Sequence, residues 1–151
     1  MITLELELSQ MAIIDKSLGD LDFLKKYKRI KFFADCSYHI DLSKIGEEDI
    51  TINPEEKTLS ITVPKPDIYN ISINEDKTIF EESQNGFLRF GEVKLSTEEF
   101  NSLQNEVLTN FEEKLKRDEI YEEALNKSKI SIEELLSSLI KEEVEIKIYF
   151  K

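Results

Sequence analysis

The chain has 151 residues, 40% of them hydrophobic and 34% charged, which predicts one folded domain over residues 1–151. Acidic residues outnumber basic ones by 32 to 20, giving a formal net charge of -12. This balance argues against nucleic acid and against an anionic membrane surface as a partner. The single cysteine, Cys36, excludes an intrachain disulfide and a cysteine-based zinc finger.

Apolar runs are short throughout the chain. The longest is the four-residue segment from Met11 to Ile14, whereas a helix that spans a bilayer needs about 20 apolar residues. Met1 is followed by a strand pattern rather than by the basic and apolar regions of a signal peptide. We therefore expect that this chain does not insert directly into a membrane and that it is soluble.

The first half of the chain has the two-residue period of strands. Apolar residues alternate with polar ones from Ile2 to Leu8, which indicates a half-buried strand. Residues 16–28 contain the breakers Ser17, Gly19 and Asp20 and are interpreted as a short helix or a loop. Alternation returns over residues 30–42 with the following apolar face: Ile30, Phe32, Ala34, Cys36, Tyr38, Ile40 and Leu42.

A hairpin is the next predicted feature. Ile50 and Ile52 form one arm, residues 59–63 form the other, and the turn-rich segment 53–57 joins them. Pro64 and Pro66 then forbid continued central pairing. A further strand is expected at 69–73, and short strands at 79–80 and 87–90 around the Asn85-Gly86 turn.

Helical patterns dominate after residue 94. Ser96 and Glu99 have the spacing of a capping box, and an apolar stripe follows from Phe100 to Leu115. Ser131 and Glu134 have the same spacing and predict the start of a further helix. Residues 144–150 return to alternation, so this segment is expected to pair with the sheet.

These elements predict an α+β fold. We expect an antiparallel, mostly meander-like sheet of about six strands, covered on one face by two or three C-terminal helices. The final strand returns to that sheet.

Cys36 and His39 do not form a nucleophile and base pair in this reading, because residues three apart on a strand point to opposite faces. Cys36 belongs to the apolar face and is predicted to be a buried core residue. Paired acids recur along the chain, but no feature selects two for acid–base chemistry, and no phosphate loop or nucleophile elbow is present. We expect no enzyme, no metal site and no cofactor.

One polar strand face supplies weak binding candidates. Asp35, Ser37, His39 and Asp41 alternate along the strand, with neighbours about 7 Å apart. This arrangement permits a metal ion or a histidine–carboxylate pair. The side chains on one strand diverge and the chain has no second histidine, so a solvated polar face is the favoured interpretation.

The chain resembles a bacterial family, DUF4230, a domain of unknown function. The resemblance is carried by the I-D-L-S-K-I run at residues 40–45, by Ile50 and Ile52, by the L-S-I-T-V-P arm at 59–64, and by the later helix. It covers nearly the whole chain. The resemblance implies an N-terminal membrane helix ahead of the domain in the parent protein, and it brings no catalytic residues.

Two functions follow as hypotheses. The first is a non-enzymatic protein-interaction domain, the soluble part of an N-terminally anchored bacterial protein, lying outside the cytoplasm or alternatively inside it. The second is a small-ligand-binding domain with a pocket between sheet and helices, lined by aromatic residues such as Phe100 and Phe111. A protein partner is expected in the first case, and nucleic acid in neither.

Overall fold

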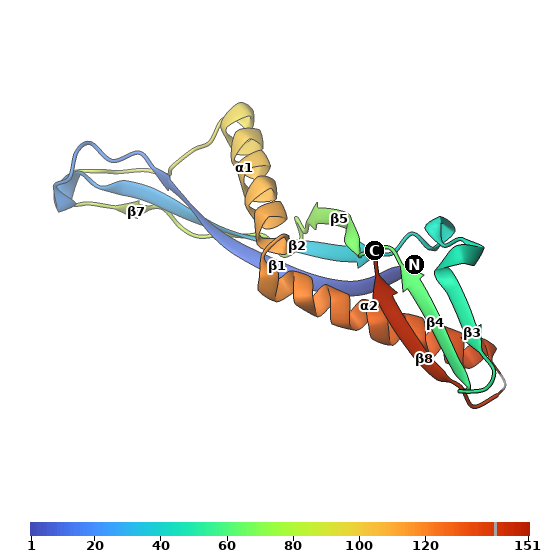
Figure 1. The fold of residues 1–151 in the computed structure, drawn as a ribbon. Helices are drawn as coiled ribbons and strands as arrows, with labels where there is room; N and C mark the ends of the chain where they lie inside the picture. Colours follow the sequence, from blue (N-terminus) through green and yellow to red (C-terminus); the bar gives the residue numbers. More distant parts are fainter. Residues whose placement is uncertain (141) are drawn as a thin grey trace. The chain divides into compact units, whose positions relative to one another are not determined.

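The computed structural model describes residues 1–140 and 142–151, which fold as an α+β protein (Figure 1). Contacts within the chain divide it into two compact units. Unit 1 contains residues 1–6, 36–70 and 115–151, and unit 2 contains residues 7–35 and 71–114. The α+β class is confirmed, but the prediction of a single six-stranded meander is wrong because the strands form two sheets.

The larger sheet has five strands, with the order β1-β2-β5 and with β6 and β7 also paired to β2. The β6 and β7 pairings are antiparallel. A 3-10 turn at Asp22–Leu24 lies in the connection between β1 and β2. The strand bounds are β1 Ile2–Asp15, β2 Lys26–His39, β5 Asp67–Ile73, β6 Ile79–Phe80 and β7 Gln84–Asn85.

The smaller sheet lies in unit 1 and has the order β3-β4-β8. Its strands are β3 (Ile50–Asn53), β4 (Thr58–Val63) and β8 (Glu145–Phe150). The predicted hairpin is confirmed as the antiparallel β3–β4 pair, in which Ile50 is opposite Ile61. β8 does return to a sheet, but it pairs with β4 in parallel, with Thr58 opposite Glu145.

Two prolines explain why the sheet is divided. Pro64 and Pro66 separate β4 from β5, and proline has no backbone N–H to donate to a neighbouring strand. A ladder cannot run through that segment, so β4 and β5 are separate strands; β5 pairs with β2, and β4 pairs with β3 and β8.

Two α-helices lie between β7 and β8 in the described part of the chain. α1 spans Thr97–Leu115 and α2 spans Asp118–Leu139. The capping box at α1 is confirmed, since the Glu99 amide donates to Ser96 Oγ at 3.1 Å and the Ser96 amide donates to Glu99 Oε2 at 2.9 Å. The predicted helix start at Ser131 is wrong, because α2 runs through it. No glycine or proline lies within α2, and Ser128 and Ile132 keep the face of the helix buried.

The strand periodicity along β2 is confirmed. Ile30, Phe32, Ala34, Cys36 and Tyr38 are all buried, as the alternating pattern requires. In β1 the alternation holds from Leu4 onwards but reverses at the start, where Ile2 is exposed and Thr3 is buried. Thr3 Oγ1 accepts a hydrogen bond from the buried Ser128 hydroxyl at 2.8 Å, so the polar side chain is satisfied inside unit 1.

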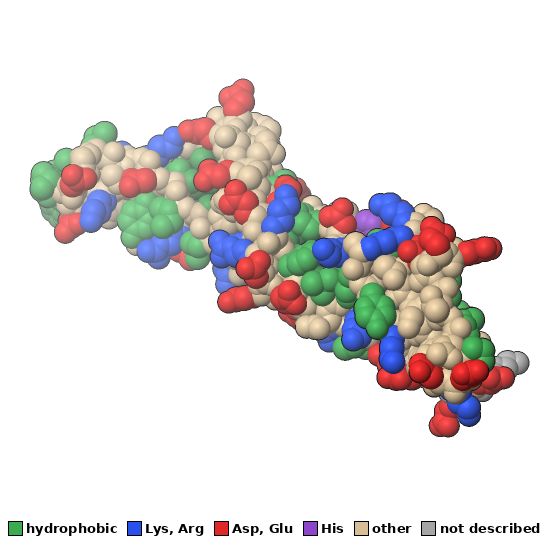
Figure 2. Space-filling view, in the orientation of Figure 1, with side chains coloured by type: hydrophobic (Ala, Val, Ile, Leu, Met, Phe, Trp, Pro, Cys, Tyr) green, Lys and Arg blue, Asp and Glu red, His purple; other side chains and the backbone are tan. Residues whose placement is uncertain are grey.

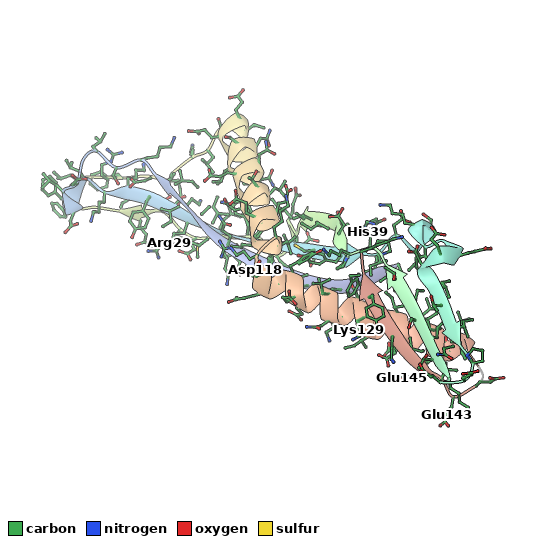
Figure 3. The ribbon with its side chains drawn as sticks, viewed as in Figure 1. Arg29, His39, Asp118, Lys129, Glu143 and Glu145 are labelled. Carbon is green, nitrogen blue, oxygen red and sulfur yellow. The ribbon has the colours of Figure 1, made fainter. Side chains whose placement is uncertain are left out.

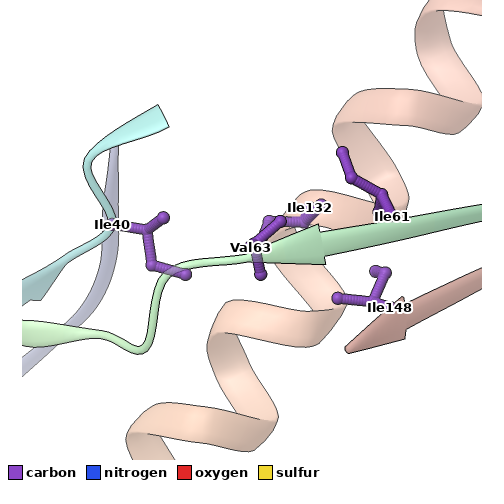
Figure 4. Packing of buried hydrophobic residues seen from close by; sticks show 5 residues of the cluster. All are labelled: Ile40, Ile61, Val63, Ile132 and Ile148. Carbon is purple, nitrogen blue, oxygen red and sulfur yellow. The ribbon is translucent and has the colours of Figure 1, made fainter. Parts of the chain in front are cut away.

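The core of unit 1 lies between the smaller sheet and α2. Five buried aliphatic residues form it, and Figure 4 shows them gathered around the end of β4. Leu136, Ile146 and Phe150 pack against this cluster and are partly buried. The cluster consists of Ile40, Ile61, Val63, Ile132 and Ile148.

The core of unit 2 is formed where α1 meets the larger sheet. Val107 and Phe111 of α1 are buried, as are Ile30 and Phe32 of β2. The Phe32 and Phe100 rings have centroids 6.3 Å apart, a distance typical of aromatic pairs that contribute beyond their buried area.

Unit 1 contains a buried tyrosine whose ionisation would affect the stability of the fold. Tyr38 is fully buried, and its hydroxyl donates a hydrogen bond to the Leu115 carbonyl oxygen. Desolvation by burial raises the pKa of Tyr38 to about 12.

We expect Tyr38 to make the free energy of unfolding depend on pH in the alkaline range. The folded pKa is above the unfolded value of about 10, so the protonated phenol stabilises the fold fully below about pH 10. That contribution is lost as the pH rises from about 10 through about 12. Tyr38→Phe should cost about 1–3 kcal/mol at pH 7, because the Leu115 carbonyl is left unpaired.

Urea unfolding of both proteins at neutral and alkaline pH measures this. The difference between wild type and Tyr38→Phe should shrink as the pH rises. A difference that stays constant up to about pH 12 would show that Tyr38 does not titrate in this way.

Candidate binding surfaces

The four polar residues predicted on one strand face have different surroundings. Asp35 is exposed, and one carboxylate oxygen accepts a hydrogen bond from Asn74 Nδ2 at 2.9 Å within unit 2. Ser37, His39 and Asp41 belong to unit 1. Ser37 is only 7% exposed, so it does not belong to a solvated face.

Asp41 has a local structural role. Strand β2 ends at His39, and Asp41 caps the 3-10 turn at Leu42–Lys44. Its Oδ1 atom accepts from the Ser43 amide at 3.1 Å and from the Ser43 hydroxyl at 2.6 Å. These bonds to Ser43 hold the pKa of Asp41 below its usual value.

His39 lies where β2 ends, beside β5, and its ring meets the Tyr69 ring edge to face (Figure 3). The two centroids are 5.0 Å apart. The Nδ1 atom is buried and has no hydrogen-bond partner within residues 1–140 and 142–151. The same part of the chain contains no group of three His, Cys, Asp or Glu residues that could hold a metal ion.

Cys36 is buried, as predicted from its place in the apolar set of β2. Its thiol is therefore shielded from solvent, whereas a reactive cysteine needs a partly exposed and electropositive environment. This observation supports a packing role for Cys36.

Two neighbouring depressions in unit 2 border Phe100, between the larger sheet and α1. One encloses about 380 Å³ and is lined by Lys28, Phe80 and Phe100 among others. The other encloses about 220 Å³ and reaches Gln104. Phe80 and Phe100 have ring centroids 6.0 Å apart. Phe111, the second aromatic residue predicted at such a pocket, is fully buried in the core and does not line it.

An uncovered apolar surface lies along β3 in unit 1. Ile50 and Ile52 pair with Ile61 and Leu59, and residues that are directly opposite in an antiparallel pair share one face of the sheet. The β4 residues are buried, but Ile50 is 43% exposed and Ile52 is 69% exposed. The apolar face of the sheet therefore continues beyond the part that is buried.

A second apolar surface is formed by two connections of unit 2, the one between β1 and β2 and the one after β7. Their backbones are joined, because the Leu88 amide donates to the Phe23 carbonyl at 3.0 Å and the Gly86 amide donates to the Lys25 carbonyl at 2.8 Å. Green apolar atoms gather at this end of the unit, at the left of the view in Figure 2. We call the following exposed residues the apolar tip: Leu18, Leu21, Phe23, Phe87, Leu88 and Phe90.

Sequence reasoning missed the apolar tip because it interpreted 87–90 as a strand, which is wrong. The Arg89 amide donates to the Gly86 carbonyl at 2.9 Å, which closes a turn that exposes Phe87 and Phe90. The signal in the sequence that could have indicated a turn is the placement of F-L-R-F between Gly86 and Gly91. In the structure Gly91 has a φ of 79°, a conformation that glycine adopts readily.

The structure is therefore that of a small α+β protein that exposes apolar side chains along β3 and at the apolar tip. Among the described residues, no helix combines the length and the apolar character needed to cross a bilayer. The chain belongs to the family described as "Protein of unknown function (DUF4230)", whose model matches residues 1–146. No curated protein and no solved structure matches the chain.

We expect His39 to act through its ring contact rather than as a ligand. His39→Phe should leave the free energy of unfolding unchanged or raise it slightly, because it keeps a ring against Tyr69 and removes the unpaired Nδ1. His39→Ala should cost about 1 kcal/mol by losing the ring contact. Urea unfolding checks both values. A rise in melting temperature with Zn²⁺ that His39→Phe abolishes would instead identify a metal ligand.

Proposed function

We propose that this protein is a non-enzymatic protein-interaction domain that binds an extended segment of a partner along β3. The observation that supports the proposal is the uncovered apolar edge of the smaller sheet at Ile50 and Ile52. An edge strand has unpaired backbone groups on its outer side, and an added strand can pair with them while its side chains contact the exposed apolar face.

The two edges of this sheet differ in a way that favours β3. β8, at the other edge, has charged side chains, and Lys147 Nζ lies 3.4 Å from Glu145 Oε2. Charged residues, lysine above all, are a common means of preventing edge-to-edge association. β3 has the sequence I-T-I-N, with no charge.

The segment before β3 is held in place. The Asp49 carboxylate accepts from the Gly46 amide at 2.9 Å and from Lys151 Nζ at 2.6 Å. These bonds, first that to Lys151, keep the pKa of Asp49 below its usual value. A pre-ordered edge reduces the conformational entropy that binding would otherwise remove.

Ile52→Lys should weaken partner binding at least about tenfold, because it places a charge on the docking face and removes apolar contact. The stability should change by no more than about 0.5 kcal/mol, since the side chain is exposed. A photo-crosslinking residue at position 52, introduced in cells that produce the protein, identifies the partner. Binding of the purified partner to wild type and Ile52→Lys is then measured by calorimetry.

Ile130→Lys is the matched control, because Ile130 of α2 is 50% exposed and lies outside the sheet. It should leave binding unchanged. The proposal fails if no crosslink depends on position 52, or if the wild-type protein turns over a substrate.

We further propose that the domain is the soluble part of a membrane-anchored bacterial protein, outside the cytoplasm or alternatively inside it. This is supported by the family resemblance, which implies a membrane helix ahead of the domain. The gene sequence upstream of Met1 tests it: a coding segment of about 20 apolar residues supports an anchor, and the basic residues that flank it indicate the orientation.

A small-ligand-binding domain is the second candidate function, favoured by the two depressions beside Phe100. Their volumes, about 380 and 220 Å³, fall at or below the lower end of the range for ligand pockets. Aromatic walls from Phe80 and Phe100 suit a flat aromatic molecule, and an anionic group on it would compete with Glu92 Oε2, 3.3 Å away, for the Lys28 ammonium.

The dye anilinonaphthalene sulfonate has this chemistry and provides a test. If the depressions bind ligands, the native protein should bind one dye molecule saturably, and Gln104→Phe should weaken binding at least about tenfold by filling the smaller depression. Phe87→Ser, which changes the apolar tip, should not affect it. A fluorescence titration measures both effects, and dye binding that only Phe87→Ser removes would exclude this function.

A further inference from the structure

We propose that the apolar tip of unit 2 docks onto an acidic depression on unit 2 of a second copy of the chain. The proposal concerns surfaces other than β3 and does not rest on the protein-interaction function. Two independent features of unit 2 support it: an apolar, cationic projection and an apolar depression with an acidic rim.

The projection exposes large side chains that nothing in its own unit covers. Phe87 is 85% exposed and Phe90 is 82% exposed, which is rare for phenylalanine in a folded protein. Four further apolar residues surround them from two different connections. Contiguous exposed apolar surface of this kind indicates an interaction site, whereas single exposed residues do not.

The charge of the projection is opposite to that of the chain. Residues 16–26 and 84–91 contain four basic and two acidic side chains, a local net charge of +2 in a chain with -12. Lys16 pairs with Glu99, and Lys25 pairs with Asp22 at 2.5 Å. Lys26 Nζ and Arg89 Nη2 instead donate to the carbonyl oxygens of Phe90 and Lys16, at 2.9 and 3.1 Å. In the described part of the chain neither cation forms an ion pair, although Lys26 lies close enough to Glu92 for their charges to interact.

The projection is also ordered by its own hydrogen bonds. The Leu18 amide donates to the Leu24 carbonyl at 3.1 Å, and the Leu24 amide donates to the Leu21 carbonyl at 2.9 Å. Together with the bonds between the two connections, these hold parts of the tip backbone in a fixed conformation. A surface that is already ordered loses less conformational entropy when it binds.

The depression lies where the end of β1 meets the start of α1, and it encloses about 480 Å³. Its walls are apolar, formed by Ile13, Ile14, Leu95 and Leu103. Acidic residues of α1 line the same depression, and two of them, Glu98 and Glu106, are exposed and form no ion pair within the described residues.

The two surfaces complement each other in polarity and charge. Aromatic rings on one side meet an aliphatic hollow on the other, and two unpaired cations face two unpaired carboxylates. Apolar centres with charged rims are the usual anatomy of protein interfaces, and opposite charges at the rim fix register and partner choice. A reciprocal contact closes a dimer, and a one-way contact makes a chain of copies. Both use the same two surfaces.

The test measures the mass of the purified chain by analytical ultracentrifugation over a range of concentrations. The wild type should associate as its concentration rises. Phe87→Ser with Phe90→Ser should weaken association at least about tenfold, because two anchoring rings are lost. These side chains are almost fully exposed, so the melting temperature should be retained.

A charge exchange identifies the contact. Lys26→Glu with Arg89→Glu, and Glu98→Lys with Glu106→Lys, should each weaken association about tenfold, and the four changes combined in one chain should restore it. The pair Glu133→Lys and Glu143→Lys changes the net charge as much as the Glu98 and Glu106 pair does, at sites outside unit 2. This control should leave association unchanged.

Three results would overturn the proposal: a chain that is monomeric at every concentration, association that the two Phe changes do not weaken, or a combined variant that stays dissociated. Sedimentation with vesicles of equimolar phosphatidylcholine and phosphatidylglycerol identifies the alternative. A monomeric chain that binds these vesicles through Phe87 and Phe90 would assign the apolar tip to a membrane surface instead.

Discussion

The burial of alternate side chains along β2 is the constraint on which both units depend. Ile30, Phe32 and Ala34 lie in unit 2, and Cys36 and Tyr38 lie in unit 1, yet all five are at most 4% exposed. One strand therefore supplies core residues to each unit. All the remaining strands of the larger sheet pair with β2. A change of register by one residue would expose this whole set and bury charged residues, so the pattern fixes the register strongly.

Local signals in the sequence predicted the elements well, and non-local pairing explains most errors. The β3–β4 hairpin, the capping box at Ser96 and the apolar face of β2 each depend on residues that are close in sequence. The parallel pairing of β8 with β4 joins residues more than eighty positions apart, and no local pattern specifies it. The prediction of a helix start at Ser131 was wrong because the spacing of a capping box also occurs inside a helix whose buried face continues.

The candidate sites also depend on contacts between residues that are distant in sequence, which local patterns do not specify. Periodicity correctly placed Ser37 and His39 opposite the apolar set on the strand, but it could not show that Ser37 is buried or that Tyr69 lies against the His39 ring. The exposed apolar surfaces could likewise not be predicted, because they depend on how much of each side chain the folded protein leaves uncovered. Ile52 is apolar and alternates correctly, so its sequence pattern is that of a core residue. Only the tertiary structure shows that it is 69% exposed.

Charge distinguishes the two apolar surfaces of this chain. β3 has no charged residue and offers backbone groups, which suits an extended segment of varied charge. The apolar tip has a local excess of basic residues within an acidic chain, which favours the acidic counterpart that we propose for it. The large negative charge elsewhere opposes non-specific association between copies. The proposed contact between copies is placed where the sign of the charge is reversed, since it joins the tip to the acidic depression of unit 2.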